Sequence, residues 1–175
     1  MLKGKAVYLS PLAEKDSEVL FEWINDRELV LSSAPFRPVH EINHLEWFGK
    51  IRNQSDVVIF GIRRGDDDCL VGTCQLHSIS AIHRSAELQI RIGRKDVQGR
   101  GFGTEACALL LRYAFQDLNL NRVFLHIFAT NERAIRLYTR NGFKVEGALR
   151  NSVFVDGRWL DVVIMAILRS EYPTG

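Results

Sequence analysis

A glycine-rich turn in front of an apolar-periodic segment is the part of this sequence best suited to bind an anion. Gly99, Gly101 and Gly103 stand close together, and residues 106–114 then carry apolar side chains at helical spacing. Glycines let the backbone turn tightly and approach a ligand, and free N–H groups converge at the positive end of the helix dipole. Arg100 adds a cation beside them. The turn predicts a pyrophosphate site, with a plain helix-starting turn as the alternative.

The glycine spacing excludes two common phosphate-binding motifs. It does not follow the G-x-G-x-x-G pattern of dinucleotide-binding folds, and the strand expected before it is the fourth in the chain rather than the first. A Walker loop needs Gly-Lys followed by Ser or Thr, which the sequence lacks. The phosphate-bearing ligand is therefore expected to bind through neither of these two motifs.

A second candidate for chemistry is His40-Glu41-Ile42-Asn43-His44, which satisfies the H-E-x-x-H pattern of zinc peptidases. It follows Pro35 and Pro38 and is expected to occupy a first helical turn. Ile42 and Leu45 are expected to face the core, which leaves the two histidines near the rim. No third ligand stands out, so we expect no metal and interpret these as solvated helix-start residues or as contacts to a substrate. A zinc peptidase is the alternative.

The elements that must position these residues alternate between strand and helix patterns. Asp16 or Ser17 can cap the first helix, and residues 29–39 hold two prolines and are expected to form a loop. Strands are expected at 6–10, 57–63, 69–78, 86–92, 123–128, 144–155 and 159–168, and helices at about 17–25, 40–52, 106–114 and 132–140. The pattern predicts one α/β domain, residues 1–175, with a mixed sheet and helices on its faces.

The composition is that of an ordinary globular chain. Of 175 residues, 46% are hydrophobic and 25% charged, which suffices for a full core and excludes collagen-like and disordered classes. A net charge of +2 is low for a nucleic-acid-binding protein, and no apolar run is long enough to span a membrane. The first residues lack the apolar stretch of a signal peptide, and the three cysteines match no disulfide framework. We expect a reduced, cytoplasmic protein without nucleic-acid or membrane partners.

Two motifs resemble the GNAT superfamily of acyl-CoA N-acyltransferases. The family's Gln/Arg-x-x-Gly-x-Gly/Ala motif matches Gln98-Gly99-Arg100-Gly101-Phe102-Gly103, and its second motif is similar to Asn131-Glu132-Arg133-Ala134-Ile135-Arg136-Leu137-Tyr138, followed by Asn141-Gly142-Phe143. The stretch from Glu146 to Asp161 is similar to the branch that holds ribosomal-protein N-terminal acetyltransferases and bacterial spermidine acetyltransferases. The resemblance covers residues 86–170. It implies a mixed, mostly antiparallel seven-stranded sheet, splayed between its fourth and fifth strands and flanked by about four helices, with acetyl-CoA in the split.

The resemblance also implies how acetyl-CoA is held. Main-chain groups of Ile90, Arg91 and Ile92 would bind the pantetheine amides, as an added strand would. Main-chain amides of the glycine turn would bind the pyrophosphate, and the second motif would add two residues. This second part of the cofactor-binding set is Gln98, Gly99, Arg100, Gly101, Phe102, Gly103, Thr104, Asn131 and Ala134.

Tyr138 and Glu87 are the candidates for proton transfer. Acyl transfer from a thioester expels a thiolate whose thiol has a pKa of about 8.5, so a phenol with a pKa of about 10 can protonate it or donate a hydrogen bond to it. Related enzymes place a carboxylate at the position of Glu87, which makes it the candidate base for the amine, with a water chain as the alternative. Without the resemblance, Tyr138 would be interpreted as a core residue and Glu87 as an outward-facing strand carboxylate.

The predicted function is transfer of an acetyl group from acetyl-CoA to a primary amine, by direct attack in a ternary complex without metal. The acceptor would be a polyamine, an amino sugar or a protein N-terminus. Carboxylates between positions 14 and 46 are interleaved with Arg27, Arg37 and His40, a mixture that does not resemble a dedicated polyamine site. A homo-oligomer is compatible with the sequence. The alternatives are the zinc peptidase and a protein that binds CoA without turnover.

The remaining features are interpreted as structural. Asp66-Asp67-Asp68 is expected at a solvated hairpin tip, and His126 and Cys107 are expected in the packed core. Trp23 and Trp47 fit either the core or the wall of an acceptor pocket.

Overall fold

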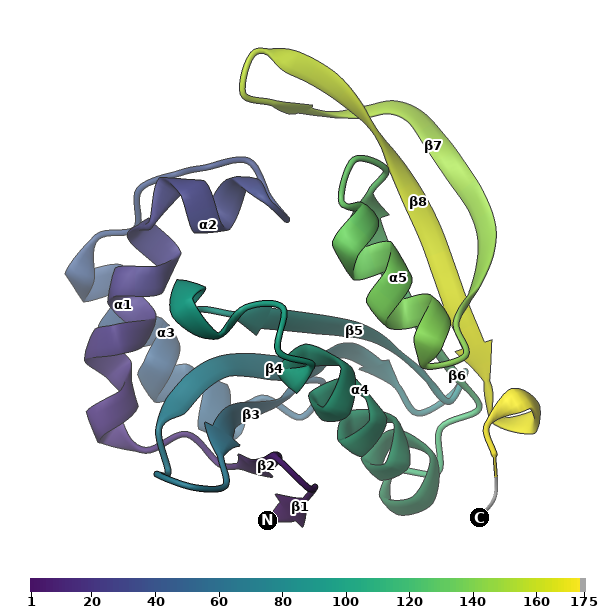
Figure 1. Ribbon diagram of the computed structural model, residues 1–175, viewed down its shortest axis with the longest axis horizontal. Helices are drawn as coiled ribbons and strands as arrows, with labels where there is room; N and C mark the ends of the chain where they lie inside the picture. The colour runs from purple at the N-terminus through teal and green to yellow at the C-terminus, as the bar shows by residue number, and fades with distance from the viewer. Residues whose placement is uncertain (174–175) are drawn as a thin grey trace.

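One eight-stranded sheet forms the centre of the molecule (Figure 1), for which a computed structural model describes residues 1–173. Its strand order is β1-β2-β3-β4-β5-β6-β8-β7, and all neighbours are antiparallel except the parallel pair β5 and β6. The strands are β1 (Leu2–Lys3), β2 (Val7–Ser10), β3 (Val58–Arg64), β4 (Leu70–Ser80), β5 (Ser85–Ile92), β6 (Arg122–Phe128), β7 (Lys144–Val155) and β8 (Arg158–Leu168). The sequence predicted seven strands and missed β1, because a two-residue strand is too short to show alternation.

Helices cover both faces of this sheet. They are α1 (Ser17–Asn25), α2 (Arg27–Leu31), α3 (Glu41–Lys50), α4 (Phe102–Arg112) and α5 (Glu132–Arg140). Short 3-10 segments lie at Glu14–Asp16, Ile51–Asn53, Lys95–Val97 and Arg169–Glu171, and a π-helical turn at Tyr113–Asp117 ends α4. Ala86 and Leu88 of β5 join the main core with α4, whereas the alternate residues Gln89 and Arg91 face the α1 and α3 side. None of the helices within residues 1–173 is long and apolar enough to cross a membrane.

The last three residues of helix α2 overlap the segment 29–39 that was predicted to be a loop, and that prediction is wrong for residues 29–31. Asp26 accepts a hydrogen bond from the Leu29 amide at 3.1 Å and caps the helix. Leu29 and Val30 are buried, so tertiary contacts stabilise a helix that ends before Pro35.

The sheet splits between β5 and β6. The two strands pair only where Ser85, Ala86 and Glu87 lie beside residues 122–124. Beyond this point β5 stays paired with β4 and β6 with β8, so the strands diverge. The predicted splay between the fourth and fifth strands is confirmed at this pair.

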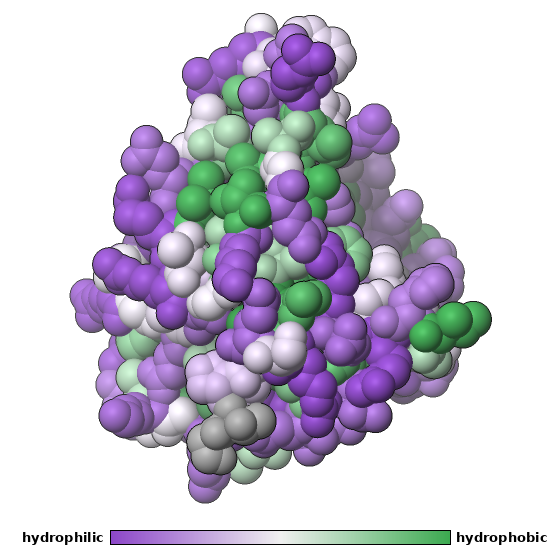
Figure 2. Space-filling view, turned by 90° about the vertical axis from the view of Figure 1, so that its right-hand side faces the viewer, coloured by the Kyte–Doolittle hydropathy of each residue, from purple (hydrophilic) through white to green (hydrophobic). Residues whose placement is uncertain are grey.

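Strands β7 and β8 form a long arm that arches over α5 toward α2 (Figure 1). Asp156 and Gly157 join them with φ of 49° and 80°, as a two-residue hairpin turn requires. Arg27 of α2 pairs with Asp156 at 2.7 Å, so the end of the arm contacts the helix across the opening. Figure 2 shows the molecule from the right-hand side of Figure 1, where apolar side chains gather on the surface. The exposed large apolar residues of the arm are Val145, Leu149, Phe154 and Trp159.

Candidate active site

The glycine turn begins α4 in a conformation that favours glycine. Gly99 and Gly101 have φ of 85° and 88°, in the left-handed region where other residues are strained, and Gly101 is the N-cap residue of α4. Gly103 serves packing instead, because a Cβ atom there would lie 2.9 Å from Leu137 Cδ1 of α5. The turn thus presents free helix-start amides beside the closely packed α4 and α5.

A cavity of about 290 Å³ lies between this turn, β5 and α5, and we call it the split cavity. Of the residues predicted from the sequence, it is lined by Ile90, Arg91, Ile92, Gln98, Gly99, Gly101, Phe102, Gly103, Thr104, Asn131, Ala134 and Tyr138. Arg100 is exposed and does not line it, and neither does Glu87. The two sequence motifs therefore come together around one space, although they are about thirty residues apart.

Side chains at the rim of the split cavity are held by hydrogen bonds. The Asn131 side chain accepts from the Ala134 amide at 3.1 Å, which makes it the N-cap of α5, and donates to the Ser32 carbonyl at 2.9 Å. Gln98 Nε2 donates to the Ile92 carbonyl at 3.0 Å. Gln98 thereby covers a main-chain oxygen at the open edge of β5.

Sequence reasoning missed a row of arginines on α5. Arg133, Arg136 and Arg140 all line the split cavity, and their spacing of three and four residues puts them on one helix face. Arg133 Nη1 donates to Gln98 Oε1 at 3.1 Å. These cations give the rim the charge that a phosphate-bearing ligand needs, and their spacing was available in the sequence.

Tyr138 is buried against the wall of the split cavity, with 6% of its surface exposed. Its ring meets Phe143 edge-on with centroids 5.4 Å apart. Burial raises the pKa of the phenol well above its ordinary value, and the backbone of Ile90 lies within hydrogen-bonding reach. The phenol is therefore protonated at neutral pH and can act as a proton donor.

The buried thiols are poor nucleophiles. Cys107 is fully buried, as predicted, and burial raises its pKa and that of the buried Cys74. Both are protonated at neutral pH.

A second cavity of about 380 Å³ lies on the other face of β5, and we call it the aromatic cavity. Trp23 of α1 and Trp47 of α3 line it, which places both tryptophans in a cavity wall. Arg91 also lines the split cavity, so this residue of β5 is common to the walls of both cavities.

Helix α3 faces the core in a different orientation from the predicted one. Ile42 and Leu45 are 68% and 54% exposed, whereas His44 is only 4% exposed. The His44 ring lies between Phe21 and Trp47, with centroid distances of 5.4 and 5.5 Å. The aromatic stripe of α3 was the stronger core signal, and the prediction that both histidines lie at the rim is wrong for His44.

The H-E-x-x-H motif does not have the geometry of a zinc site. His40 is the N-cap residue of α3, and His44 Nε2 lies 2.9 Å from the Ser17 carbonyl oxygen. Because a carbonyl only accepts, this nitrogen carries a hydrogen and is directed away from any metal. In residues 1–173 no group of three His, Cys, Asp or Glu side chains could hold a metal ion.

Residues 6–144 of the chain match the acetyltransferase (GNAT) domain family. The chain belongs to the GNAT acetyltransferase family. A spermidine N(1)-acetyltransferase from Escherichia coli K12 is 30% identical over 98% of this chain and 91% of its own length. One from Vibrio cholerae is 43% identical, and that alignment spans 59% of either protein.

Solved structures agree with this assignment. The crystal structure of spermidine N-acetyltransferase from Vibrio cholerae in complex with CoA and spermine superposes with a TM-score of 0.88 at 32% identity, covering 95% of this chain and 98% of that one. The chain is therefore an acetyl-CoA-dependent N-acetyltransferase, and acetyl-CoA is its cosubstrate.

Glu87 of this acetyltransferase pairs with His126 on the neighbouring strand. Its Oε1 atom lies 2.8 Å from His126 Nδ1. His126 was expected in the packed core, and that prediction is wrong, because 41% of its side-chain surface is exposed. The pair sits where the parallel pairing of β5 and β6 ends, outside the lining of both cavities.

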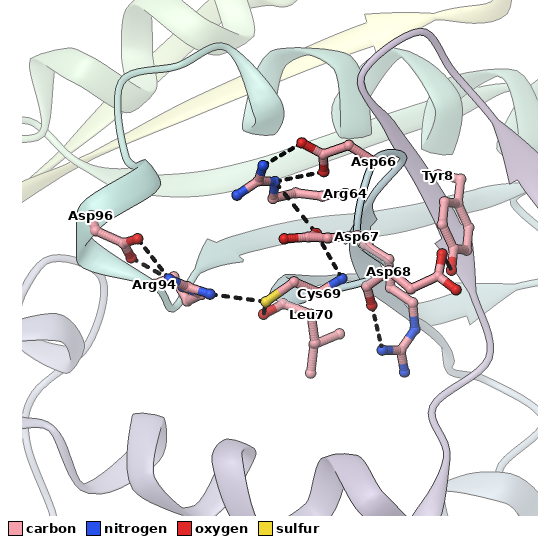
Figure 3. Close-up of polar contacts among 10 residues, drawn as sticks. Tyr8, Arg64, Asp66, Asp67, Asp68, Cys69, Leu70, Arg94 and Asp96 are labelled. Atoms are coloured by element: carbon pink, nitrogen blue, oxygen red, sulfur yellow. Dashed lines mark hydrogen bonds and ion pairs between the residues drawn. The ribbon is translucent and has the colours of Figure 1, made fainter.

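The acidic run in the turn between β3 and β4 has local partners (Figure 3). Asp66 pairs with Arg64, and Asp67 Oδ1 accepts from the Cys69 amide at 3.1 Å. Tyr8 donates to Asp68 Oδ1 at 2.9 Å. The three carboxylates thus stabilise the turn, which agrees with the structural role expected for them from the sequence.

Proposed function

We propose that this acetyltransferase transfers the acetyl group from acetyl-CoA to a primary amine by direct attack in a ternary complex. The observation that carries the proposal is that a residue of β5, Arg91, lines both cavities. A thioester held in the split cavity would be accessible to an amine entering through the aromatic cavity. No covalent intermediate on the enzyme is needed, because both reactants can be bound at once.

The open edge of β5 supports the assignment of the pantetheine site. Past Glu87 this edge has no strand partner in the part of the chain that the structure describes, so an extended amide chain can pair with it as an added strand. The Ile92 carbonyl already accepts from Gln98, which makes Ile90 the residue that we expect to pair with pantetheine. The glycine-turn amides and the α5 arginines would bind the phosphates.

Each proton in the reaction has a proposed carrier. The amine nitrogen bonds to the thioester carbon, the carbon–sulfur bond breaks, and the thiolate takes the phenol proton of Tyr138. Solvent then returns a proton to the phenolate before the next turnover. The amine gives up its own proton to water. Glu87 and His126 would receive it through that water, since Glu87 lines neither cavity.

The acceptor class is tested with a panel of amines. The relatives named above are spermidine acetyltransferases, so spermidine is assayed beside glucosamine and a short peptide with a free N-terminus. We expect amine-dependent release of CoA thiol with at least one of them, and none with the same peptide acetylated at its N-terminus. Binding of acetyl-CoA without amine-dependent release would favour the alternative of a CoA-binding protein without turnover.

Three further features stay predictions. They are a single acetyltransferase domain over residues 1–175, a cytoplasmic location and association into a homo-oligomer. Light scattering after size exclusion checks the last of these, for which the exposed apolar residues of the β7–β8 arm are a candidate contact surface.

A further inference from the structure

No carboxylate within residues 1–173 lines the aromatic cavity. Its lining is Leu20, Trp23, Ile24, Val39, Asn43, His44, Trp47, Ile59, Thr73, Gln75, Gln89 and Arg91. Its polar groups are thus amides, a hydroxyl, an imidazole and one guanidinium. A bound polycation needs anionic partners when it leaves water, and this lining offers none.

Arg91 is the cation of this cavity and is left without a carboxylate partner within residues 1–173. Its Nη2 atom donates to Ser33 Oγ at 3.3 Å, and the ion pairs of the described residues do not include it. A guanidinium carries five N–H donors, so most of its hydrogen-bonding capacity stays available. Burial lowers the pKa of Arg91, which shows that the group is partly withdrawn from solvent without a compensating anion.

Three carboxylates of the segments around α1 and α2, Asp16, Asp26 and Glu28, are already paired with other cations. Asp26 and Glu28 both contact Lys95, at 2.9 and 2.6 Å. Asp16 is buried in an ion pair with Arg63 at 2.6 Å. None of these carboxylates is free to neutralise an ammonium group brought next to Arg91.

We propose that Arg91 selects acceptor amines that carry a carboxylate, with an apolar body that lies between Trp23 and Trp47. This inference rests on the proposed function and names its acceptor class. Arg91 follows Ile90 on β5, next to the Tyr138 phenol, so an anion bound there would hold the amine of a short molecule near the thioester. A planar guanidinium binds a carboxylate through two parallel hydrogen bonds, which fixes orientation as well as charge.

A matched series of acceptors tests the proposal. 6-Aminohexanoate, 6-aminohexanamide and 1,6-diaminohexane share the attacking amine and the chain length, and differ only in an anionic, neutral or cationic far end. Spermidine is assayed beside them. kcat/KM is measured by CoA thiol release at saturating acetyl-CoA, and the carboxylate-to-diamine ratio is taken within each variant, so a general loss of activity cancels.

We expect wild type to favour the carboxylate over the diamine by about tenfold or more, with the amide between them. Arg91→Lys should keep the preference, Arg91→Gln should reduce it, and Arg91→Glu should reverse it. Arg94→Gln is the matched control, because Arg94 pairs with Asp96 at 2.7 Å and lines neither cavity. Its ratio should equal that of wild type.

Two results would overturn the inference and leave amine acetylation intact. One is a wild-type preference for the diamine or spermidine, and the other is an unchanged ratio in Arg91→Gln. Absence of CoA release with all four amines would overturn the inference, and absence with glucosamine and the free peptide as well would contradict the proposed function. If Arg91→Glu fails to fold, as judged by its melting temperature, the wild-type, Arg91→Lys and Arg91→Gln ratios decide.

Discussion

Replacing Tyr138 by Phe removes one hydroxyl group and keeps the ring that packs against Phe143. The structure places that hydroxyl in the wall of the split cavity, within reach of the Ile90 backbone. If it protonates the departing thiolate, kcat should fall by about 10²–10⁴-fold, the usual size of a general acid–base contribution. Because the ring keeps its packing, the loss of stability should not exceed about 1 kcal/mol, the size of one hydrogen bond, or about 2–4 °C in Tm for a domain of this size.

Steady-state CoA release gives kcat, calorimetry gives the acetyl-CoA dissociation constant, and thermal unfolding gives Tm. The dissociation constant should be nearly unchanged, because the proposed phosphate contacts lie on α4 and α5. Tyr113→Phe is the matched control: Tyr113 packs edge-on against Phe60, and lines neither cavity. A Tyr138→Phe enzyme as fast as wild type, at a normal Tm, would refute the general-acid role and make solvent the proton source.

The raised pKa of Tyr138 adds a pH dependence of known sign. Burial disfavours the charged phenolate, so the folded enzyme keeps the proton above the phenol's ordinary pKa of about 10. The wild-type kcat should therefore not decrease as the pH rises from 8 toward about 10. A falling limb within that range, absent in Tyr138→Phe, would show that the phenol ionises there and would contradict the structural argument.

The remaining predictions concern the phosphate site, the histidine motif and the base. Gly101→Glu introduces a negative charge and a side chain at a left-handed position, so acetyl-CoA binding measured by calorimetry should be lost while the circular dichroism of the fold persists; unchanged affinity would contradict the glycine-turn assignment. EDTA should change neither activity nor Tm, and His44→Ala should lower stability by about 2–4 kcal/mol through lost packing, whereas stoichiometric zinc in the purified protein would support a peptidase. Glu87→Gln should reduce kcat by only about tenfold, since Glu87 acts through water and the amide can still bond His126; a loss as large as that of Tyr138→Phe would indicate direct proton transfer.

The parts of the site that could be predicted from the sequence depend on local geometry. Gly99 and Gly101 are needed because of their own backbone angles, and the spacing of Asn131 and Tyr138 fixes them on one helix. The order of strands and helices could be predicted from changes in apolar periodicity. The separation of the fourth and fifth predicted strands was predicted only from the resemblance to the GNAT family.

The parts that could not be predicted depend on partners far away in the chain. Helix α3 has apolar residues on two faces, and the choice between them is made by the Ser17 carbonyl and the ring of Phe21, which bury His44. Likewise, nothing local shows that Arg91 would lie between two cavities, because its strand could have carried it on a solvated face. His126 was assigned to the core because its strand is apolar, yet its side chain pairs with Glu87 of the neighbouring strand β5.

The split in the sheet has a consequence for how the protein behaves when no cosubstrate is bound. Beyond the three paired positions, the facing edges of β5 and β6 each present main-chain groups that have no strand partner within residues 1–173. Such unpaired edges are templates for association with other polypeptides. Gln98 blunts one of these edges by donating to the Ile92 carbonyl. A ligand that fills the gap covers the rest and, at a hundredfold excess over its dissociation constant, stabilises the native state by about 2.7 kcal/mol. We therefore expect bound acetyl-CoA to reduce self-association of the enzyme, and self-association to increase when the cosubstrate is exhausted.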